Sequence, residues 1–243
     1  MTDHGYISRD YEKHPIGSDL PMSEARIFPR SEWDELIDLQ EERKSSPLHV
    51  HQYHDVPIMN QKRSKYCWAF CLVAGCMNRL AHAGINDPLP ILSGTSLAAP
   101  IKSFRNVGGY VLEAAKAAKK GIAEVGVWPE SSMNRSLVNH QSVKDSKQIN
   151  QISEFSELPR RDLAALVSVL IDPDNSRPVA IALPWWRHAV LALRARVERG
   201  KIAIDFANSY GSTWQSDGFG TLKENDAIAH EQIVIETMRA RAE

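Results

Sequence analysis

From Pro178 onward, apolar residues recur with a period of two, and this pattern constrains the fold more than any other feature of the sequence. Helical patterns occupy the earlier part of the chain instead. Helices that precede strands along the chain are typical of an α+β fold, in which the strands pair antiparallel. We therefore expect one helical lobe and one β lobe, with strands in PVAIAL (178–183), AVLALRAR (189–196), KIAIDFA (201–207), GFGTL (218–222) and EQIVIETM (231–238).

The strongest helical pattern covers residues 66–82, which are apolar nearly all round, as in a buried helix. Gly84 suits the end of that helix. Further helices are expected at 31–43, where Ser31 and Asp34 form a capping-box pattern, at 107–121 and from Asp162 to about Leu170. The remaining segments are expected to be extended or irregular: 1–30, 48–61, the loop around 88–100, and 130–160.

These patterns divide the chain into an N-terminal arm (1–55), a main domain (56–235) and a C-terminal tail (236–243). The main domain divides into a helical lobe at about 56–135 and a β lobe at about 136–235. The arm has no apolar periodicity sufficient for a core of its own. We therefore expect it to be ordered only where another surface holds it.

Composition excludes several classes of protein. Lys and Arg number 29 against 30 Asp and Glu, so no basic excess for nucleic acid binding exists. No apolar run approaches the length of a transmembrane helix, and the polar N-terminus is unlike a secretory signal. The helical spacing of Cys67, Cys71 and Cys76 disfavours disulfides. We expect a location in a reducing cytoplasm, with neither nucleic acid nor membrane as partner.

Cys67 admits two interpretations, a core thiol or a nucleophile. Free cysteines are usually core residues, and this interpretation holds for Cys71 and Cys76. At the start of its helix, however, Cys67 has the location that favours a thiolate. Thiol catalysis also needs a proton carrier, a group that orients it and oxyanion donors. His188 is the expected proton carrier, and Asn208 would orient it. The oxyanion donors would be Gln61 and the Cys67 backbone N–H.

Four stretches, which follow one another along the chain in the order of the family's motifs, resemble the papain family of cysteine peptidases (C1-type). NQKRSKYCWAF (60–70) is similar to the cysteine region, and RHAVLAL (187–193) to the histidine strand. NSYGSTWQSDGFG (208–220) is similar to the asparagine segment, and LSGTSLAAP with NVGGY (92–110) to the glycine loop that binds substrate. The resemblance covers about 56–225, and the flanks resemble bacteriophage and bacterial members most.

The resemblance implies a papain-like two-lobe fold with an active-site cleft between the lobes. It implies a peptidase that needs no cofactor or metal and acts on a protein or peptide. Cys67, His188, Asn208 and Gln61 would be the catalytic residues. Trp185 and Trp186 would pack the end of the barrel or form a wall of the cleft. The substrate-binding residues would be Gly108, Gly109, Trp68, Ala189, Tyr210 and Trp214.

The sequence departs from the family in several places. Ser64 stands where secreted members have a disulfide cysteine, consistent with a reducing compartment. Tyr210 replaces the tryptophan that covers the histidine–asparagine hydrogen bond, and Gln215 replaces a glycine. The inhibitory pro-segment of the family is not recognisable in residues 1–55.

Two other functions remain open. The chain could be a structural or assembly subunit of a phage particle, with the arm (1–55) gripping a neighbouring protein, which would make it virion-associated. It could also be an acyl transferase or deamidase on the same site. His49, His51 and His54 alternate in a way that could bind zinc, but a solvated strand is the expectation here and no metal site is predicted.

Overall fold

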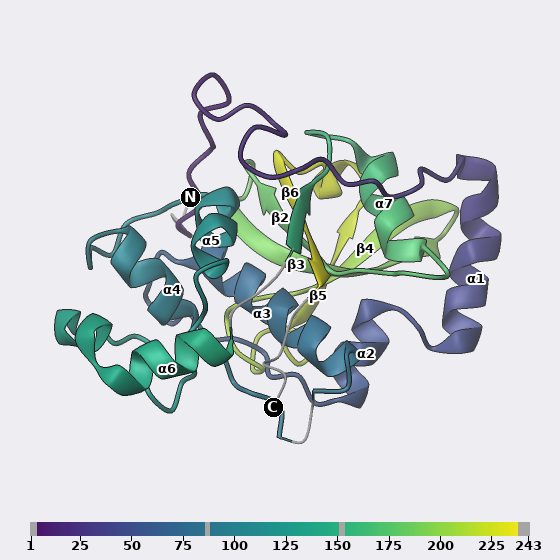
Figure 1. Ribbon diagram of the computed structural model, residues 1–243. Coiled ribbons are helices and arrows are strands. Elements are labelled where there is room, and N and C mark those ends of the chain that lie inside the picture. Colours follow the sequence, from purple (N-terminus) through teal and green to yellow (C-terminus); the bar gives the residue numbers. More distant parts are fainter. Residues whose placement is uncertain (1–3, 86–87, 151–153, 238–243) are drawn as a thin grey trace.

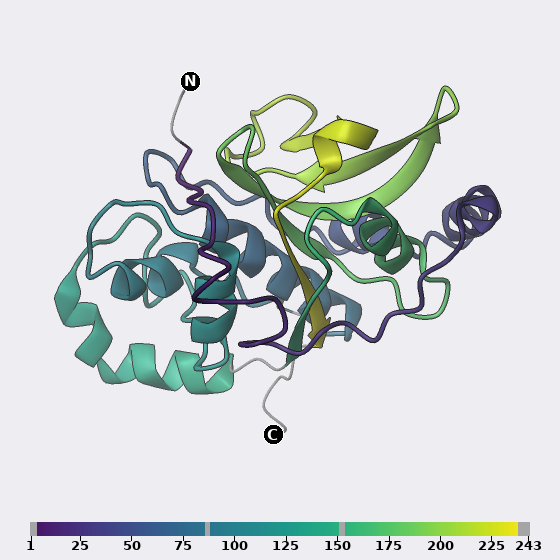
Figure 2. The same cartoon turned by 90° about the horizontal axis from the view of Figure 1, so that it is seen from above.

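The computed structural model describes residues 4–85, 88–150 and 154–237. A group of helices lies on one side of a twisted antiparallel sheet, and two further helices lie beyond the sheet (Figure 1). Turned by 90°, the molecule shows the helical lobe and the β lobe side by side (Figure 2). The expected two-lobe α+β fold is confirmed.

The sheet has six strands in the order β1-β6-β2-β3-β4-β5, each antiparallel to its neighbours. All five strands expected from the two-residue period are present. The additional strand, β1, has only four residues and includes polar ones, so periodicity gave no sign of it. The strands are β1 (Glu154–Glu157), β2 (Val179–Leu183), β3 (His188–Glu198), β4 (Lys201–Ala207), β5 (Phe219–Lys223) and β6 (Glu231–Thr237).

Helix α3 (Cys67–His82) is the centre of the molecule, and every residue from Cys67 to Ala81 is buried. It packs against β2, β3 and β6 on one side and against α4 (Gly94–Ile101) and α5 (Val111–Ala118) on the other. Gly75 permits this approach, because a Cβ there would lie 2.8 Å from Cδ1 of Ile235. The all-apolar pattern of 66–82 is explained by contacts on every side.

The alternation of the strands divides the core between the two faces of the sheet. Ala180, Ala182 and Leu191 join the cluster around α3, whereas Val179, Ile181 and Val190 join a second cluster on the opposite face. Helix α7 (Leu163–Ile171) covers that second face together with α1 (Trp33–Arg43). Asp162 caps α7 by accepting from the N–H of Ala165, as expected for a helix that begins there.

Three segments expected to be irregular or extended contain helices. Residues 48–61 begin with α2 (Pro47–Tyr53), where the Ser46 hydroxyl accepts from the N–H of His49. The 88–100 loop contains most of α4, which Ser93 caps in the same way. The 130–160 segment contains α6 (Gln141–Ile149). Side-chain caps stabilise α2 and α4, and α2 also has a proline in its first turn, whereas α6 has no side-chain cap.

The N-terminal arm packs against the rest of the same chain, including β1 and α7. Arg9 forms a buried ion pair with Glu157 of β1, and Met22 forms an isolated parallel bridge with the same residue. The Phe28 N–H donates to the Ser168 hydroxyl of α7, and α1 then packs on α7. Figure 2 shows this route, in purple, from the N-terminus across the helical lobe toward α1. The arm therefore shares the core of the domain that it was expected to precede.

The expected division at residue 55 stays a prediction. Residues 236 and 237 of the expected C-terminal tail complete β6, and 238–243 lie outside the described residues.

Candidate active site

Cys67 is the first residue of α3 and is fully buried. The backbone N–H groups of a helix's first turn, together with the helix dipole, stabilise negative charge at this end. Cys71 and Cys76 lie further along the same helix, where burial raises the pKa of both thiols. None of the three cysteines forms a disulfide. The helix therefore places one thiol where a thiolate is favoured and two where it is not.

His188 and Asn208 meet across neighbouring strands. His188 begins β3 and Asn208 directly follows β4; the Nε2 atom of His188 lies 2.8 Å from Oδ1 of Asn208. An amide oxygen can only accept, so the proton of this hydrogen bond belongs to Nε2. Burial lowers the pKa of His188 to about 3, against the opposing effect of the Asn208 hydrogen bond. The ring is thus neutral here, with Nδ1 free of a proton.

Aromatic rings surround the His188 imidazole. The Tyr210 ring stacks on it at 4.8 Å between centroids, with its hydroxyl 3.4 Å from Nδ1. Trp186 meets it edge-on at 4.7 Å, and Trp214 packs against both Trp186 and Tyr210. The sequence suggested that Trp186 packs the end of the barrel or forms a wall of the cleft; its contact with His188 was not expected. Two aromatic side chains, Tyr210 and Trp186, therefore contact the imidazole and Trp214 packs on both, where the family pattern has a single tryptophan.

Gln61 is held in place from both ends of its amide. Its Oε1 accepts from the Ser209 hydroxyl at 2.6 Å, and its Nε2 donates to the Ser64 carbonyl at 2.6 Å. The Gln61 backbone N–H also donates to the Ser209 carbonyl at 2.8 Å. Ser209 was not singled out in the sequence, although it directly follows Asn208. It fixes the side chain expected to donate to the oxyanion.

Tyr210 connects Cys67 with the other residues of the site. It hydrogen-bonds to His188, and its pKa is raised by burial and, to a lesser extent, by the electrostatic influence of Cys67. An isolated bridge between Asn60 and Tyr210 brings the loop before α3 to the segment after β4. The four residues expected to be catalytic thus come from four segments that meet at one end of α3, where the two lobes join.

The chain's own N-terminal residues lie across this site. The Gly109 N–H donates to the Gly5 carbonyl at 3.0 Å, and the Gly109 carbonyl accepts from the Ile7 N–H at 2.9 Å. Nε2 of Gln61 lies 3.4 Å from the His4 carbonyl, and Nδ1 of His4 lies 2.5 Å from the Tyr210 hydroxyl. No signal at residues 4–7 indicated this placement, and the glycine loop expected to bind substrate is paired with the chain itself.

The other residues expected to bind substrate differ in accessibility. Trp68 is fully buried; its indole N–H donates to the Lys65 carbonyl, and its ring lies against Gly109. Ala189 is also fully buried, next to His188 in β3. Gly108 lies against the Gly5 carbonyl. Trp68 and Ala189 are thus shielded from solvent, and contact with a ligand stays a prediction for all six residues.

The histidine cluster has a different environment from the solvated strand that was expected. His49 and His51 lie on α2, and His51 is buried with both ring nitrogens unbonded. Burial lowers its pKa to about 4, so it is a neutral core residue. Within the described ranges, no group of three or more His, Cys, Asp or Glu side chains could hold a metal ion. Nor does any helix of the described chain have the length and apolarity to cross a membrane.

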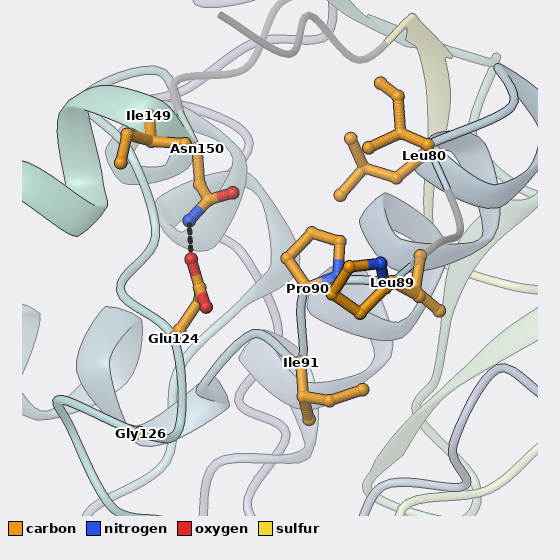
Figure 3. Close-up of a pocket in the computed structure, with 10 residues that line it drawn as sticks. Leu80, Leu89, Pro90, Ile91, Glu124, Gly126, Ile149 and Asn150 are labelled. Carbon is orange, nitrogen blue, oxygen red and sulfur yellow. Dashed lines mark hydrogen bonds between the residues drawn. The ribbon is translucent and has the colours of Figure 1, made fainter.

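A cavity of about 450 Å³ lies elsewhere, between the last turns of α3 and α6 and the 88–91 loop (Figure 3). Leu80, Pro90 and Ile149 are among its apolar lining residues, and Asn150 donates to Glu124 on one side. None of the candidate catalytic residues lines it. The cavity is therefore separate from the site at the other end of α3.

Replacing Gln61 by alanine tests its expected role. We expect kcat to fall by about 10²–10³-fold, the usual effect of removing one oxyanion donor, with a smaller change in KM. Steady-state kinetics on a peptide substrate measure the effect. Gln52→Ala, an exposed position on α2, is the matched control and should leave kcat unchanged. A Gln61→Ala variant with the kcat of the parent chain would exclude this role.

The fold is similar to those of several solved structures. No protein-family model and no curated protein sequence matches the chain. Among solved structures, it is similar to digestive procathepsin L 3 of Tenebrio molitor, with a TM-score of 0.59 and 19% identity over 73% of this chain and 65% of that one. The chain thus spans less than two thirds of the length of that procathepsin.

Two other cysteine proteases are similar over more of their own length. Xylellain from Xylella fastidiosa matches with a TM-score of 0.61 and 17% identity, over 75% of this chain and 83% of that one. Bromelain from Ananas comosus, in complex with the E64 inhibitor, matches with a TM-score of 0.56 and 17% identity, over 79% and 97%. The chain therefore has the two-lobe fold of papain-like cysteine proteases.

Proposed function

We propose that this protein is a cysteine peptidase that hydrolyses peptide bonds at Cys67. The observation that carries the proposal is the hydrogen bond from His188 Nε2 to Asn208 Oδ1, which Tyr210 links to Cys67 at the N-terminus of α3. Asn208 fixes the tautomer that leaves Nδ1 as the base. The similarity to solved cysteine proteases supports the reaction class.

The reaction follows from these roles. His188 takes the thiol proton at Nδ1, and the Cys67 thiolate attacks the carbonyl carbon of the substrate. Nε2 of Gln61 and the Cys67 backbone N–H stabilise the resulting oxyanion. The imidazolium then gives its proton to the leaving amine, and a thioester remains on Cys67. A water molecule deprotonated by His188 hydrolyses the thioester, which releases the acid and restores the thiol.

Alkylation with iodoacetamide, followed by peptide mapping, tests the proposal. Because the N-terminal residues lie across the site, the full chain and its Gly5→Ala variant are both assayed on an unfolded protein substrate. We expect the loss of cleavage to follow modification of Cys67, while the buried Cys71 and Cys76 react far more slowly and act as internal controls. Cleavage that survives complete modification of Cys67, or equal reactivity of the three thiols, would contradict the proposal.

The alternatives differ in their products. An acyl transferase on the same site would transfer the acyl group from Cys67 to an added amine, and a deamidase would release ammonia; product analysis by mass spectrometry separates both from hydrolysis. A structural role in a phage particle was suggested by the long arm without a core of its own and by the missing pro-segment. The described arm residues contact their own chain, and this role stays a prediction. Location in a host cytoplasm or a virion stays a prediction from the resemblance to bacteriophage members, which fractionation of infected cells would test.

A further inference from the structure

Residues 4–7, here called the plug, occupy the position at which a ligand would meet Gly109. Both hydrogen-bonding groups of Gly109 are used by the plug, through the Gly5 carbonyl and the Ile7 N–H. Between them, Tyr6 donates its N–H to the Arg187 carbonyl at 3.1 Å, and its side chain is only 2% exposed. The plug is therefore held by an isolated parallel bridge to Gly109, with one aromatic residue buried.

The fit of the plug depends on two glycines. Gly5 has a φ of +107°, and a Cβ there would overlap the Lys65 carbonyl. A Cβ on Gly108 would in turn overlap the Gly5 carbonyl. Backbone therefore lies directly against backbone on both sides of Gly5, an approach that only glycine permits without strain.

Beyond the plug, the arm is fixed. The Arg9 side chain is 1% exposed, forms an ion pair with Glu157, and donates to the His14 and Pro15 carbonyls. Ile7, in contrast, is 51% exposed, and Ser8 is also exposed. The contacts that hold the plug are thus confined to residues 4–7, and Ser8 lies between them and a firmly anchored point. Rotation about the backbone near Ser8 would release the plug and leave the rest of the arm in place.

We propose that the plug is a reversible inhibitor in the same chain, which an extended polypeptide displaces without any cut in the chain. The incoming strand takes over the N–H and carbonyl of Gly109, so the exchange conserves these two hydrogen bonds. A small ligand that cannot pair with Gly109 gains nothing to offset the loss of the plug's contacts. This inference rests on the proposed function, because it concerns regulation of the same site.

The rate at which iodoacetamide modifies Cys67 tests the inference without any need for turnover. Gly5→Ala should raise this rate by about tenfold or more, because the added Cβ expels the plug and increases the open population. Gly17→Ala is the matched control: Gly17 lies in the same arm with a φ of +78°, and a Cβ there would meet only the flexible Met22 side chain. Tyr6→Ser, which removes the buried anchor, should act like Gly5→Ala, and thermal melting confirms that each variant is folded.

A peptide supplied in trans completes the experiment. HGYISRD, the sequence of residues 4–10, should slow the alkylation of Gly5→Ala, and a scrambled peptide should not. The intact mass should stay at that of the uncut 27.2 kDa chain throughout. Equal alkylation rates in the parent chain and both plug variants would overturn the inference. So would an increase that appears only after the N-terminal residues are lost from the mass.

The outcomes separate this inference from the proposed function. Faster alkylation of Gly5→Ala without cleavage of any substrate would support the plug and contradict the peptidase. Equal cleavage by the parent chain and Gly5→Ala, at equal alkylation rates, would support the peptidase and contradict the plug.

Discussion

Cys67→Ala is expected to lower kcat for peptide cleavage by roughly 10⁶-fold, the scale on which removal of a nucleophile acts when the residues of a site work as a unit. Alanine has no atom that can attack the carbonyl, and no other thiol can replace it, because burial raises the pKa of Cys71 and Cys76. The measurement is steady-state cleavage of a peptide substrate, in the Gly5→Ala background so that the plug does not limit access.

Cys76→Ala is the control for this prediction. Cys76 lies on the same helix and is equally buried, so its replacement changes packing by a similar amount. Its activity should stay within a few-fold of the parent chain, with both variants folded by thermal melting. If Cys67→Ala retained activity comparable to that of Cys76→Ala, the nucleophile would have to be another residue.

Arg9→Met is expected to destabilise the protein by about 3–5 kcal/mol, the usual cost of removing one partner of a buried ion pair. The side chains of Arg9 and Glu157 are 1% and 3% exposed, so the substitution leaves the Glu157 carboxylate buried without its cation. The hydrogen bond that the Gly17 N–H donates to that carboxylate, at 2.7 Å, is too weak to replace the lost cation. Equilibrium unfolding in urea measures the loss, provided that the transition is two-state.

Two further variants make this prediction specific. Arg26→Met breaks an ion pair in the same arm whose side chains are 68% and 42% exposed, and it should cost no more than about 1 kcal/mol. The double variant Arg9→Met/Glu157→Leu should recover part of the loss, because no unpaired charge stays buried. An Arg9→Met variant as stable as Arg26→Met would mean that solvent reaches Glu157 despite its burial.

The sequence predicted those parts of the fold whose cause is local. The β2–β6 strands followed from a two-residue period, and α3 from a run that is apolar on every side. The four candidate catalytic residues were found because each lies in a stretch that resembles a known motif, in the same order along the chain. The structure brings these four side chains to one end of α3, and their roles stay proposals.

The features that sequence reasoning missed depend on contacts between distant segments. Helix α2 forms in a segment without apolar periodicity, because Ser46 caps it and the Asn78 side chain of α3 donates to Pro47. Trp186 contacts His188 only through the geometry of the turn between β2 and β3. The plug is the clearest case, because glycine at position 5 carries no sign of the Lys65 carbonyl that requires it.

The close contact of Gly75 with Ile235 and Leu191 has a mechanical consequence for access to Cys67. Helix α3 belongs to the helical lobe by connectivity but is seated directly on the sheet, with its side chains interlocked with those of β2, β3 and β6. Because α3 packs against both lobes, moving the lobes apart would break the contacts between α3 and the sheet. On the proposed function, access to the Cys67 thiol would then depend on displacement of the plug, with the packing of α3 on the sheet unchanged.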